Sequence, residues 1–372
     1  MVAQSGGERA ARLAALLALP LVFGWQAAQV YLGFDGNWTA LFYHDSNPPL
    51  PQGFEETYLH PVGGDYDGQY YRYLARDPVP PFAYAKWFDA PAQRGSRILL
   101  PGLAWALSFG GRAAPDAIYI LLVDLFAAAG VYCAGRWLAA MGRSAWLGLC
   151  FLLLPGVVSS VDRLLIDVAL AACVAGFYMA AETGNRRLML ACAMAAPLAR
   201  ETGFALPVAL LLTGNARSGL AAFLPGAAWT AAVLAMYPLQ ARPRELGFLP
   251  VEWVRRLLEP RPHPEPAAEA LLRSLDVAAL LGLAILFFWT LRHALPRIAD
   301  PQAMAALLFL AGGFFLGGIN VMSDPYHWGR VQSPWMLWIL MRALVGGRWP
   351  PLLALGAVTL TPLAHSARRL LD

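Results

Sequence analysis

Long apolar runs separated by short polar stretches dominate the chain. Runs with at most one charged residue occupy positions 13–32, 117–135, 277–291 and 303–322. Several approach the ~20 residues with which an α-helix crosses a bilayer, and helices are favoured there because lipid offers the backbone no hydrogen bonds. The pattern predicts an all-α fold, a polytopic transmembrane helical bundle with about 9–11 membrane segments.

Less regular runs lie between these. Residues 97–111 form a short run with a Pro-Gly pair, which predicts a segment at the interface or one that re-enters without crossing. Residues 144–158 and 164–181 predict a pair of spans. Prolines and two adjacent charged residues interrupt the run 188–213, and we expect two half-helices around a break there.

Two polar stretches stand out within what we take as one domain over residues 1–372. Residues 33–97 are rich in Pro, Asp, Tyr and Trp and are too long for a mere connector. We expect this first large loop to carry short interfacial helices. Residues 240–272 form a second polar loop.

Charge bias sets the orientation. If the N-terminus is cytoplasmic, the loop 33–97 is exterior and the positive-inside rule is satisfied. The arginines that then face the cytoplasm are Arg136, Arg143, Arg186, Arg187, Arg217, Arg292, Arg297, Arg342 and Arg348. Lys86 is the only lysine in an alanine-rich chain, a composition typical of GC-rich bacteria. We therefore expect a multi-pass protein of the bacterial inner (plasma) membrane, in contact with its lipids.

Composition narrows the function classes. The chain is 58% hydrophobic and 14% charged, against roughly 25% charged in soluble domains. The net charge is only +4 and the arginines sit at segment ends, so no basic patch for nucleic acid is expected. The four cysteines lie within apolar runs and form no ligand-spaced cluster.

On this topology, polar residues from distant segments converge on the exterior side. Ionisable groups at membrane depth are costly, so they face a cavity, pair with each other or bind a charged ligand. The residues that converge are Asp65, Asp67, Arg97, Asp162, Arg163, Arg200, Glu201, Asp324, His327 and Arg330.

The stretch "GGDYDGQYYRYLARDP" (63–78) places Asp65 and Asp67 between glycines. One interpretation is structural: Asp67 caps a helix that runs to Asp77, where Pro78 disfavours the helical conformation. The other is chemical. A carboxylate at the membrane surface serves as a general base, or Asp65 and Asp67 hold a divalent cation, Mg²⁺ or Mn²⁺.

Similar alternatives apply to the other candidates. Arg97 either reaches toward lipid phosphates or binds a substrate phosphate. Arg200 and Glu201 form an internal salt bridge or belong to a binding site. His327 and Arg330 lie beside aromatic residues and suit an anionic headgroup.

An ordered set of loose motifs over most of the chain resembles bacterial membrane glycosyltransferases of the GT-C superfamily and, more distantly, the GPI mannosyltransferases. The motifs are "YDGQYYRYLARDP" (66–78), "RILLPGLAWALSFG" (97–110), "LPGVVSSVDRLLIDVALAA" (154–172), "PLARETGFALP" (197–207) and "WGRVQSPW" (328–335). Such families use a sugar linked to a polyprenyl phosphate as donor and place an acidic residue of the first exterior loop at the active site.

The resemblance implies that Asp67, in "YDGQ", is the catalytic carboxylate and that Asp65 is the second choice. Gln69 and Tyr70 of the same motif would bind substrate together with the convergent residues from Arg97 to Arg330. The acceptor would be a lipid or a glycan on the exterior face. A transporter or flippase of a lipid-linked or small anionic substrate is the alternative, because broken helices with charges also mark transport sites.

Overall fold

The structure is a computed structural model that describes residues 2–368 apart from 48, 62–65, 239–246, 248, 259–265 and 316–324. The described part of the chain is almost entirely helical, so the predicted all-α class is confirmed. Its strands β1 (His44–Asp45) and β2 (Leu59–His60) form one short parallel pair.

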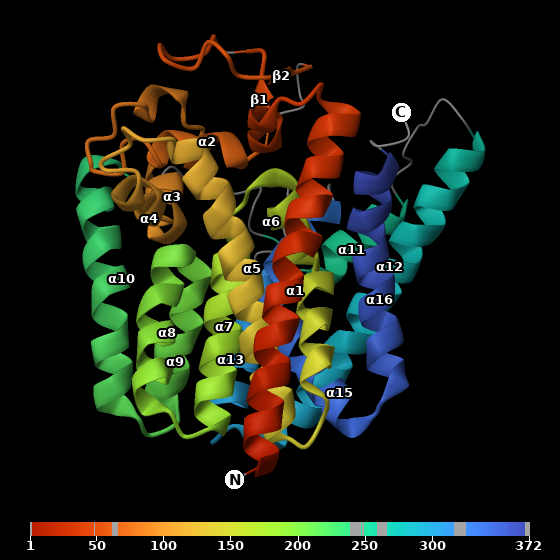
Figure 1. Cartoon of the computed structure of the whole chain (residues 1–372). Helices are drawn as coiled ribbons and strands as arrows, with labels where there is room; N and C mark the ends of the chain where they lie inside the picture. The colour runs from red at the N-terminus through yellow and green to blue at the C-terminus, as the bar shows by residue number, and fades with distance from the viewer. Residues whose placement is uncertain are drawn as a thin grey trace.

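Four helices of the described residues are long and apolar enough to cross a membrane, judged by length and composition. They are α1 (Val2–Gly33), α5 (Pro115–Ala140), α10 (Ala216–Met236) and α12 (Pro266–Ala294), and they run roughly along one direction in Figure 1. A bent pair would make a fifth span. The higher count expected from the sequence stays a prediction.

Apolar side chains remain exposed along the outer faces of these helices. Because residues three or four apart share one face of a helix, the exposed positions form continuous stripes. A soluble monomer rarely leaves so much apolar surface in contact with water, so these faces suit a lipid environment. They are Leu13, Leu16, Leu17 and Leu21 of α1, Leu220 and Leu224 of α10, and Leu281, Ile285 and Phe288 of α12.

The run 144–158, expected to be one span, is broken in the structure. A 3₁₀ helix, η3 (Ala145–Leu153), is followed by α6 (Pro155–Arg163), and the two are bent by 66°. Leu154 between them is extended, because a proline disfavours the helical conformation of the residue before it. The second member of the predicted pair corresponds to α7 (Asp167–Glu182).

The break expected in 188–213 is confirmed. Helix α8 (Arg186–Ala199) ends at Arg200, which is extended, and η4 (Glu201–Phe204) and α9 (Ala205–Leu212) follow. The remaining helices are α4 (Leu99–Leu107), which is too short to cross, α11 (Leu249–Leu258), η6 (Leu295–Arg297), α13 (Pro301–Phe315), α15 (Pro325–Gly346) and α16 (Trp349–Arg368).

The second polar stretch, 240–272, is not simply a loop. It contains α11 and the start of α12. Residues 240–246, 248 and 259–265 of that stretch lie outside the described residues.

The first large loop folds as a cap on one end of the bundle (Figure 1). It contains η1 (Trp38–Phe42), α2 (Gly68–Leu74), η2 (Ala85–Trp87) and α3 (Pro91–Ser96), so the expected short helices are present. Phe54, Tyr73 and Tyr84 pack ring against ring inside it. Arg72 of α2 ties the cap to α5 through a 2.7 Å ion pair with Asp116.

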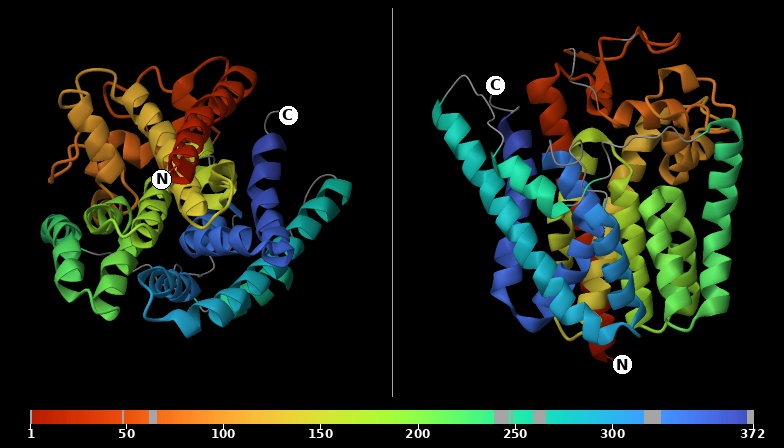
Figure 2. Two further views of the ribbon diagram at one scale, coloured as in Figure 1. Left: turned by 60° about the horizontal axis from the view of Figure 1, so that its bottom comes forward. Right: turned by 180° about the vertical axis from the view of Figure 1, so that it is seen from behind.

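The opposite end of the bundle gathers the turns that carry the arginines expected in the cytoplasm. The N-terminus and the turns α5–η3, α7–α8, α9–α10, α12–α13 and α15–α16 lie at this end (Figures 1 and 2). Arg136 pairs with Glu8 of α1 at 3.7 Å, and Arg143 donates to the carbonyl oxygen of Val345 at 2.9 Å. The helix bundle therefore carries charged residues at both of its ends, and its helices are apolar between them.

Candidate active site

Asp67 begins α2 but does not cap it. Its backbone is helical and its side chain makes no capping hydrogen bond, so the structural interpretation from the sequence is wrong. Its carboxylate is instead bound on both oxygens: Arg94 Nη2 lies 2.9 Å from Oδ1 and Arg330 Nη2 lies 2.9 Å from Oδ2. Two charge-assisted bonds outweigh a local cap. The helix also ends earlier than expected, at Leu74 instead of Asp77.

Arg94 is the first of two buried arginines on Asp67. It lies on α3, and Asp89 binds its guanidinium through two hydrogen bonds of 2.9 Å. The guanidinium also stands over the ring of Tyr70, 4.9 Å from its centroid. Arg94 is therefore fixed on three sides before it reaches Asp67.

Arg330 is the second, and it joins three elements. Placed on α15, it bonds Asp67 of the cap with Nη2 and Asp167 with Nε at 2.8 Å. Asp167 is the first residue of α7, and its other oxygen pairs with Arg200. Arg200 is available for this contact because α8 ends there. The break in 188–213 thus delivers a cation to the site.

Arg97 and Glu201 form a second ion pair of the same cluster. Arg97, at the end of α3, donates to both oxygens of Glu201 at 2.6 and 2.8 Å and to the hydroxyl of Tyr71 at 2.9 Å. Arg200 Nε lies 4.0 Å from Glu201. The bidentate geometry makes this a strong, oriented pair.

Asp162 and Arg163 lie beside this cluster but have other contacts. Asp162 is almost fully buried and accepts a 2.9 Å bond from Gln29 of α1. Arg163 stands over the rings of Tyr43 and Tyr66, 4.8 and 4.2 Å from their centroids. Gln29 therefore connects Asp162 to α1, and Arg163 Nε lies 3.7 Å from the other oxygen of Asp162.

His327 also packs against Tyr66. The two rings are stacked with centroids 5.0 Å apart, and Arg330 also lies 5.3 Å from the Tyr66 ring. Gln69, the second residue of α2, is buried. Of the residues selected from the sequence, Asp65 and Asp324 lie outside the described residues.

Opposite charges alternate through the cluster. Four arginines (Arg94, Arg97, Arg200, Arg330) contact four carboxylates (Asp67, Asp89, Asp167, Glu201). Burial raises the pKa of Asp67, but the charges of Arg94 and Arg330 outweigh it and hold that pKa well below its usual range. Asp67 is therefore an ionised carboxylate whose oxygens are both occupied.

An apolar groove opens beside the cluster. It has a volume of about 350 Å³ and runs between the η4–α9 segment, α13 and α15. Glu201 lines its mouth, and Val331, next to Arg330, lines its wall. Phe204, Val208 and Leu308 make the interior apolar. The groove is thus an apolar space whose lining includes Glu201, the partner of Arg97, and the residue that follows Arg330.

The described residues contain no group of three or more His, Cys, Asp or Glu side chains that could bind a metal ion. Asp67, one of the two ligands considered from the sequence, has both oxygens on arginines. A divalent cation at this carboxylate would be repelled by two neighbouring guanidinium groups.

Asp167 and Arg94 were missed by the sequence reasoning. Asp167 stands inside the apolar stretch "LLIDVALAA", so the criterion that selected Arg200, a charge within an apolar run, would have found it as well. Arg94 lies in a polar loop where nothing in the pattern distinguishes it. Comparison with known proteins gives no relative: no family model, no curated protein and no solved structure matches the chain.

Proposed function

We propose that the chain is an integral-membrane glycosyltransferase that moves a sugar from a polyprenyl-phosphate donor to a lipid or glycan acceptor on the exterior face. The observation that carries the proposal is Asp67, a carboxylate held between two buried arginines, of which Arg330 directly precedes Val331 in the wall of an apolar groove. These are the parts that such a transfer needs: a base, cations for a phosphate, and room for an isoprenoid chain.

The orientation follows from the arginine-bearing turns at the N-terminal end. With that end in the cytoplasm, as the positive-inside rule favours, the cap and the cluster face the exterior. The chain would then be a multi-pass protein of the bacterial plasma membrane, and its shorter helices, such as α7, α8 and α13, would complete the bundle.

The donor would enter from the side. Its first isoprene units fit the groove lined by Phe204, Val208 and Leu308, and its phosphate would then lie near Arg97, Arg200 and Arg330. Every arginine of the cluster already contacts a carboxylate, so the phosphate must exchange places with one. Asp67 is the natural one to yield, since it alone is bound by arginines from both the cap and α15.

The exchange would also prepare the base. Once Arg330 turns to the donor phosphate, Asp67 loses a neighbouring cation and its pKa rises. Asp67 then takes the proton of the acceptor hydroxyl, whose oxygen forms a bond to the anomeric carbon. The bond from that carbon to the phosphate oxygen breaks, and the arginines stabilise the polyprenyl phosphate that leaves.

A transporter of a lipid-linked substrate is the second candidate. The observation in its favour is the break at Arg200, which interrupts α8 and α9 beside a groove, as discontinuous helices do in transporters. The charged cluster, however, includes Asp67 and Arg94 of the cap, which covers one end of the bundle (Figure 1). A transport path would need polar groups along its depth.

The test is transfer by the purified protein from a panel of polyprenyl-phosphate sugars to lipid and glycan extracts of the cell envelope. Asp67→Asn should lower turnover about 100- to 10,000-fold, the usual cost of a lost base. Asp35→Asn is the matched control: it changes an exposed aspartate of the same loop whose positive φ Asn tolerates. Full turnover by Asp67→Asn would refute the assignment, and movement of an unmodified lipid would favour the transporter.

A further inference from the structure

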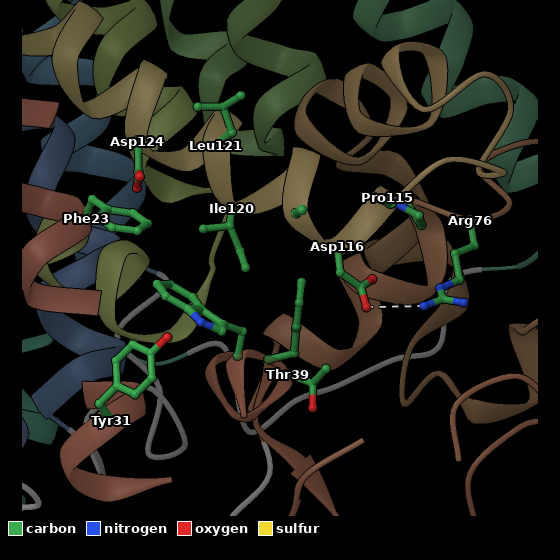
Figure 3. A pocket seen from close by; sticks show the side chains of 13 residues that line it. Phe23, Tyr31, Thr39, Arg76, Pro115, Asp116, Ile120, Leu121 and Asp124 are labelled. Carbon is green, nitrogen blue, oxygen red and sulfur yellow. Dashed lines mark hydrogen bonds and ion pairs between the residues drawn. The ribbon is translucent and has the colours of Figure 1, made fainter. Parts of the chain in front are cut away.

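A second cavity lies on another side of the cap, between α1, η1 and α5. It has a volume of about 700 Å³ and opens to the surface. Its wall is largely aromatic and aliphatic, and Figure 3 shows Phe23, Tyr31, Ile120 and Leu121 around it. The cavity continues the exposed apolar face of α1, a helix long enough to span the membrane, so an amphiphile can reach it from the bilayer.

This cavity is separate from the Asp67 cluster. Phe42 lines the cavity, and its backbone packs against Gly68, the residue after Asp67. A Cβ on Gly68 would stand 3.0 Å from the carbonyl oxygen of Phe42 and 2.5 Å from that of Arg163. Nothing as large as a substrate passes through this contact. A ligand in the cavity is therefore not a reactant at Asp67.

The polar groups at the mouth are incompletely paired. Arg72 and Arg76 both bind the same oxygen of Asp116, Oδ2, at 2.7 and 3.2 Å. In the described part of the chain, the other oxygen, Oδ1, and the Nε of Arg76 are buried without a hydrogen-bond partner. Buried polar atoms without partners are costly. The two side chains as a whole are 26% and 23% exposed, so a ligand in the cavity can reach the exposed part of this ion pair, which Figure 3 shows.

We propose that this cavity binds a membrane phospholipid whose headgroup carries a hydrogen-bond donor next to its phosphate. The phosphate accepts from the exposed part of the Arg76 guanidinium and is attracted by the two arginines that share one carboxylate. An ammonium or hydroxyl group donates to the exposed part of the Asp116 carboxylate. One chain lies along Phe23, Ile120 and Leu121. Tyr31 and Trp38 flank the cavity at the level where aromatic residues meet the membrane interface.

The test uses native mass spectrometry of the full-length protein with an equimolar mixture of three phospholipids that share the same chains. The headgroups are ethanolamine, with an ammonium donor, glycerol, with hydroxyl donors, and choline, with none. Retention of the ethanolamine or the glycerol lipid at least about tenfold above the choline lipid is expected, as for one charged hydrogen bond, and the preferred one identifies the donor. Equal retention of the choline lipid overturns the headgroup assignment.

Two leucines of α5 supply matched variants. Leu121 lines the cavity, whereas Leu125 lies one turn further along the helix outside it, and their side chains are 53% and 44% exposed. Leu121→Trp should fill the cavity and reduce lipid retention about tenfold, while Leu125→Trp should retain the wild-type level. Equal behaviour of the two variants refutes the site.

The headgroup end is tested by Arg76→Gln, which should weaken all three lipids, and by Asp116→Asn, which should remove the preference over choline. Asp124, at the deep end of the cavity beside Gln26, is the control. If Asp124→Asn abolishes the preference and Asp116→Asn leaves it intact, the headgroup lies deep and the proposal is wrong. If Asp116→Asn does not fold, Arg76→Gln and the leucine pair still decide. These experiments need no glycosyl transfer, so they stand or fall independently of the proposed reaction.

Discussion

Asp67 and Arg330 are 263 positions apart in the chain and joined by a hydrogen bond of 2.9 Å. This bond connects the cap to α15, and through Asp167 it continues to α7. Both partners are largely buried, so dissolved salt screens their attraction only weakly. The same contact therefore holds the cap on the bundle and positions the proposed base.

The first prediction concerns the cations of the donor site. Arg200→Gln and Arg330→Gln should each weaken binding of polyprenyl phosphate about tenfold or more, because each removes a charged hydrogen bond to the phosphate. Binding is measured with the sugar-free lipid phosphate, so that turnover does not enter. Arg12→Gln, an exposed arginine at the opposite end, is the control.

Arg330→Gln also leaves Asp67 and Asp167 each short of a partner, and breaking a buried pair costs about 3–5 kcal/mol. The double variant Asp67→Asn/Arg330→Gln removes one of these stranded charges and should recover part of the lost melting temperature without recovering donor binding. Unchanged affinity in both folded single variants would show that the phosphate binds elsewhere.

The second prediction concerns topology. In a cysteine-free background, a cysteine at Ser46, an exposed position of the cap, should react with an impermeant maleimide added to intact cells. A cysteine at Ala216, the exposed first residue of α10 at the other end, should react only after permeabilisation. The reverse pattern would put the cluster in the cytoplasm and exclude an exterior reaction.

The sequence identified most of the cluster because two simple rules are strong in membranes. Charges in apolar runs need partners, which selected Arg97, Arg200, Glu201 and Arg330. The positive-inside rule assigned them to one end, and their contacts in the structure agree. Five of the eight charged residues of the cluster were therefore identified from the sequence, whereas Asp89, Arg94 and Asp167 were not.

The sequence could not show which arginine of the cluster pairs with which carboxylate. A local rule made Asp67 a helix cap, but two arginines from distant elements compete for the same oxygens and win. Which arginine reaches which carboxylate depends on how α3, α7 and α15 pack, and hydropathy says nothing of that. The second cavity was missed for the same reason: Asp116 and Arg76 look like ordinary interfacial charges until their contacts are known.

The third prediction tests the packing beneath Asp67. Gly68→Ala should lower stability by about 1–3 kcal/mol, as overpacking does, because the new methyl group would lie 2.5 Å from the carbonyl oxygen of Arg163. Gly24→Ala is the control: its Cβ would meet nothing within 4 Å, and alanine favours the helix. Melting temperatures of both variants are compared. Equal shifts would mean that the cap moves freely enough to absorb the clash.

The fourth prediction concerns acid stability. Burial, together with the charges of Arg72, His60 and Arg76, lowers the pKa of His44 from 6.5 to about 2. The unfolded chain takes up a proton below about pH 6.5 while the folded one does not, so stability is lost as pH falls. At pH 5 the loss is roughly 2 kcal/mol at 1.36 kcal/mol per pH unit.

His44→Gln removes this group while keeping an acceptor near Arg72 Nη1, which lies 3.3 Å from His44 Nε2. The difference in melting temperature between pH 7 and pH 5 should therefore be smaller in the variant than in the wild type. An undiminished difference would assign the acid sensitivity to other groups.

The last prediction follows the proton at Asp67. In the free protein the two arginines keep its pKa well below the usual value, so kcat/KM, which reports the free enzyme, should stay flat down to about pH 5. In the donor complex, Arg330 binds the phosphate and the phosphate itself is a nearby anion. Both changes raise the pKa of Asp67. The acidic limb of kcat, which reports the complex, should therefore lie at higher pH than that of kcat/KM.

The test is to measure kcat and kcat/KM of the wild type between pH 4.5 and pH 8.5, which span about the range that a carboxylate base can reach. Coincident acidic limbs would mean that Asp67 keeps both arginines throughout the reaction, and the exchange of Arg330 between carboxylate and phosphate would have to be abandoned.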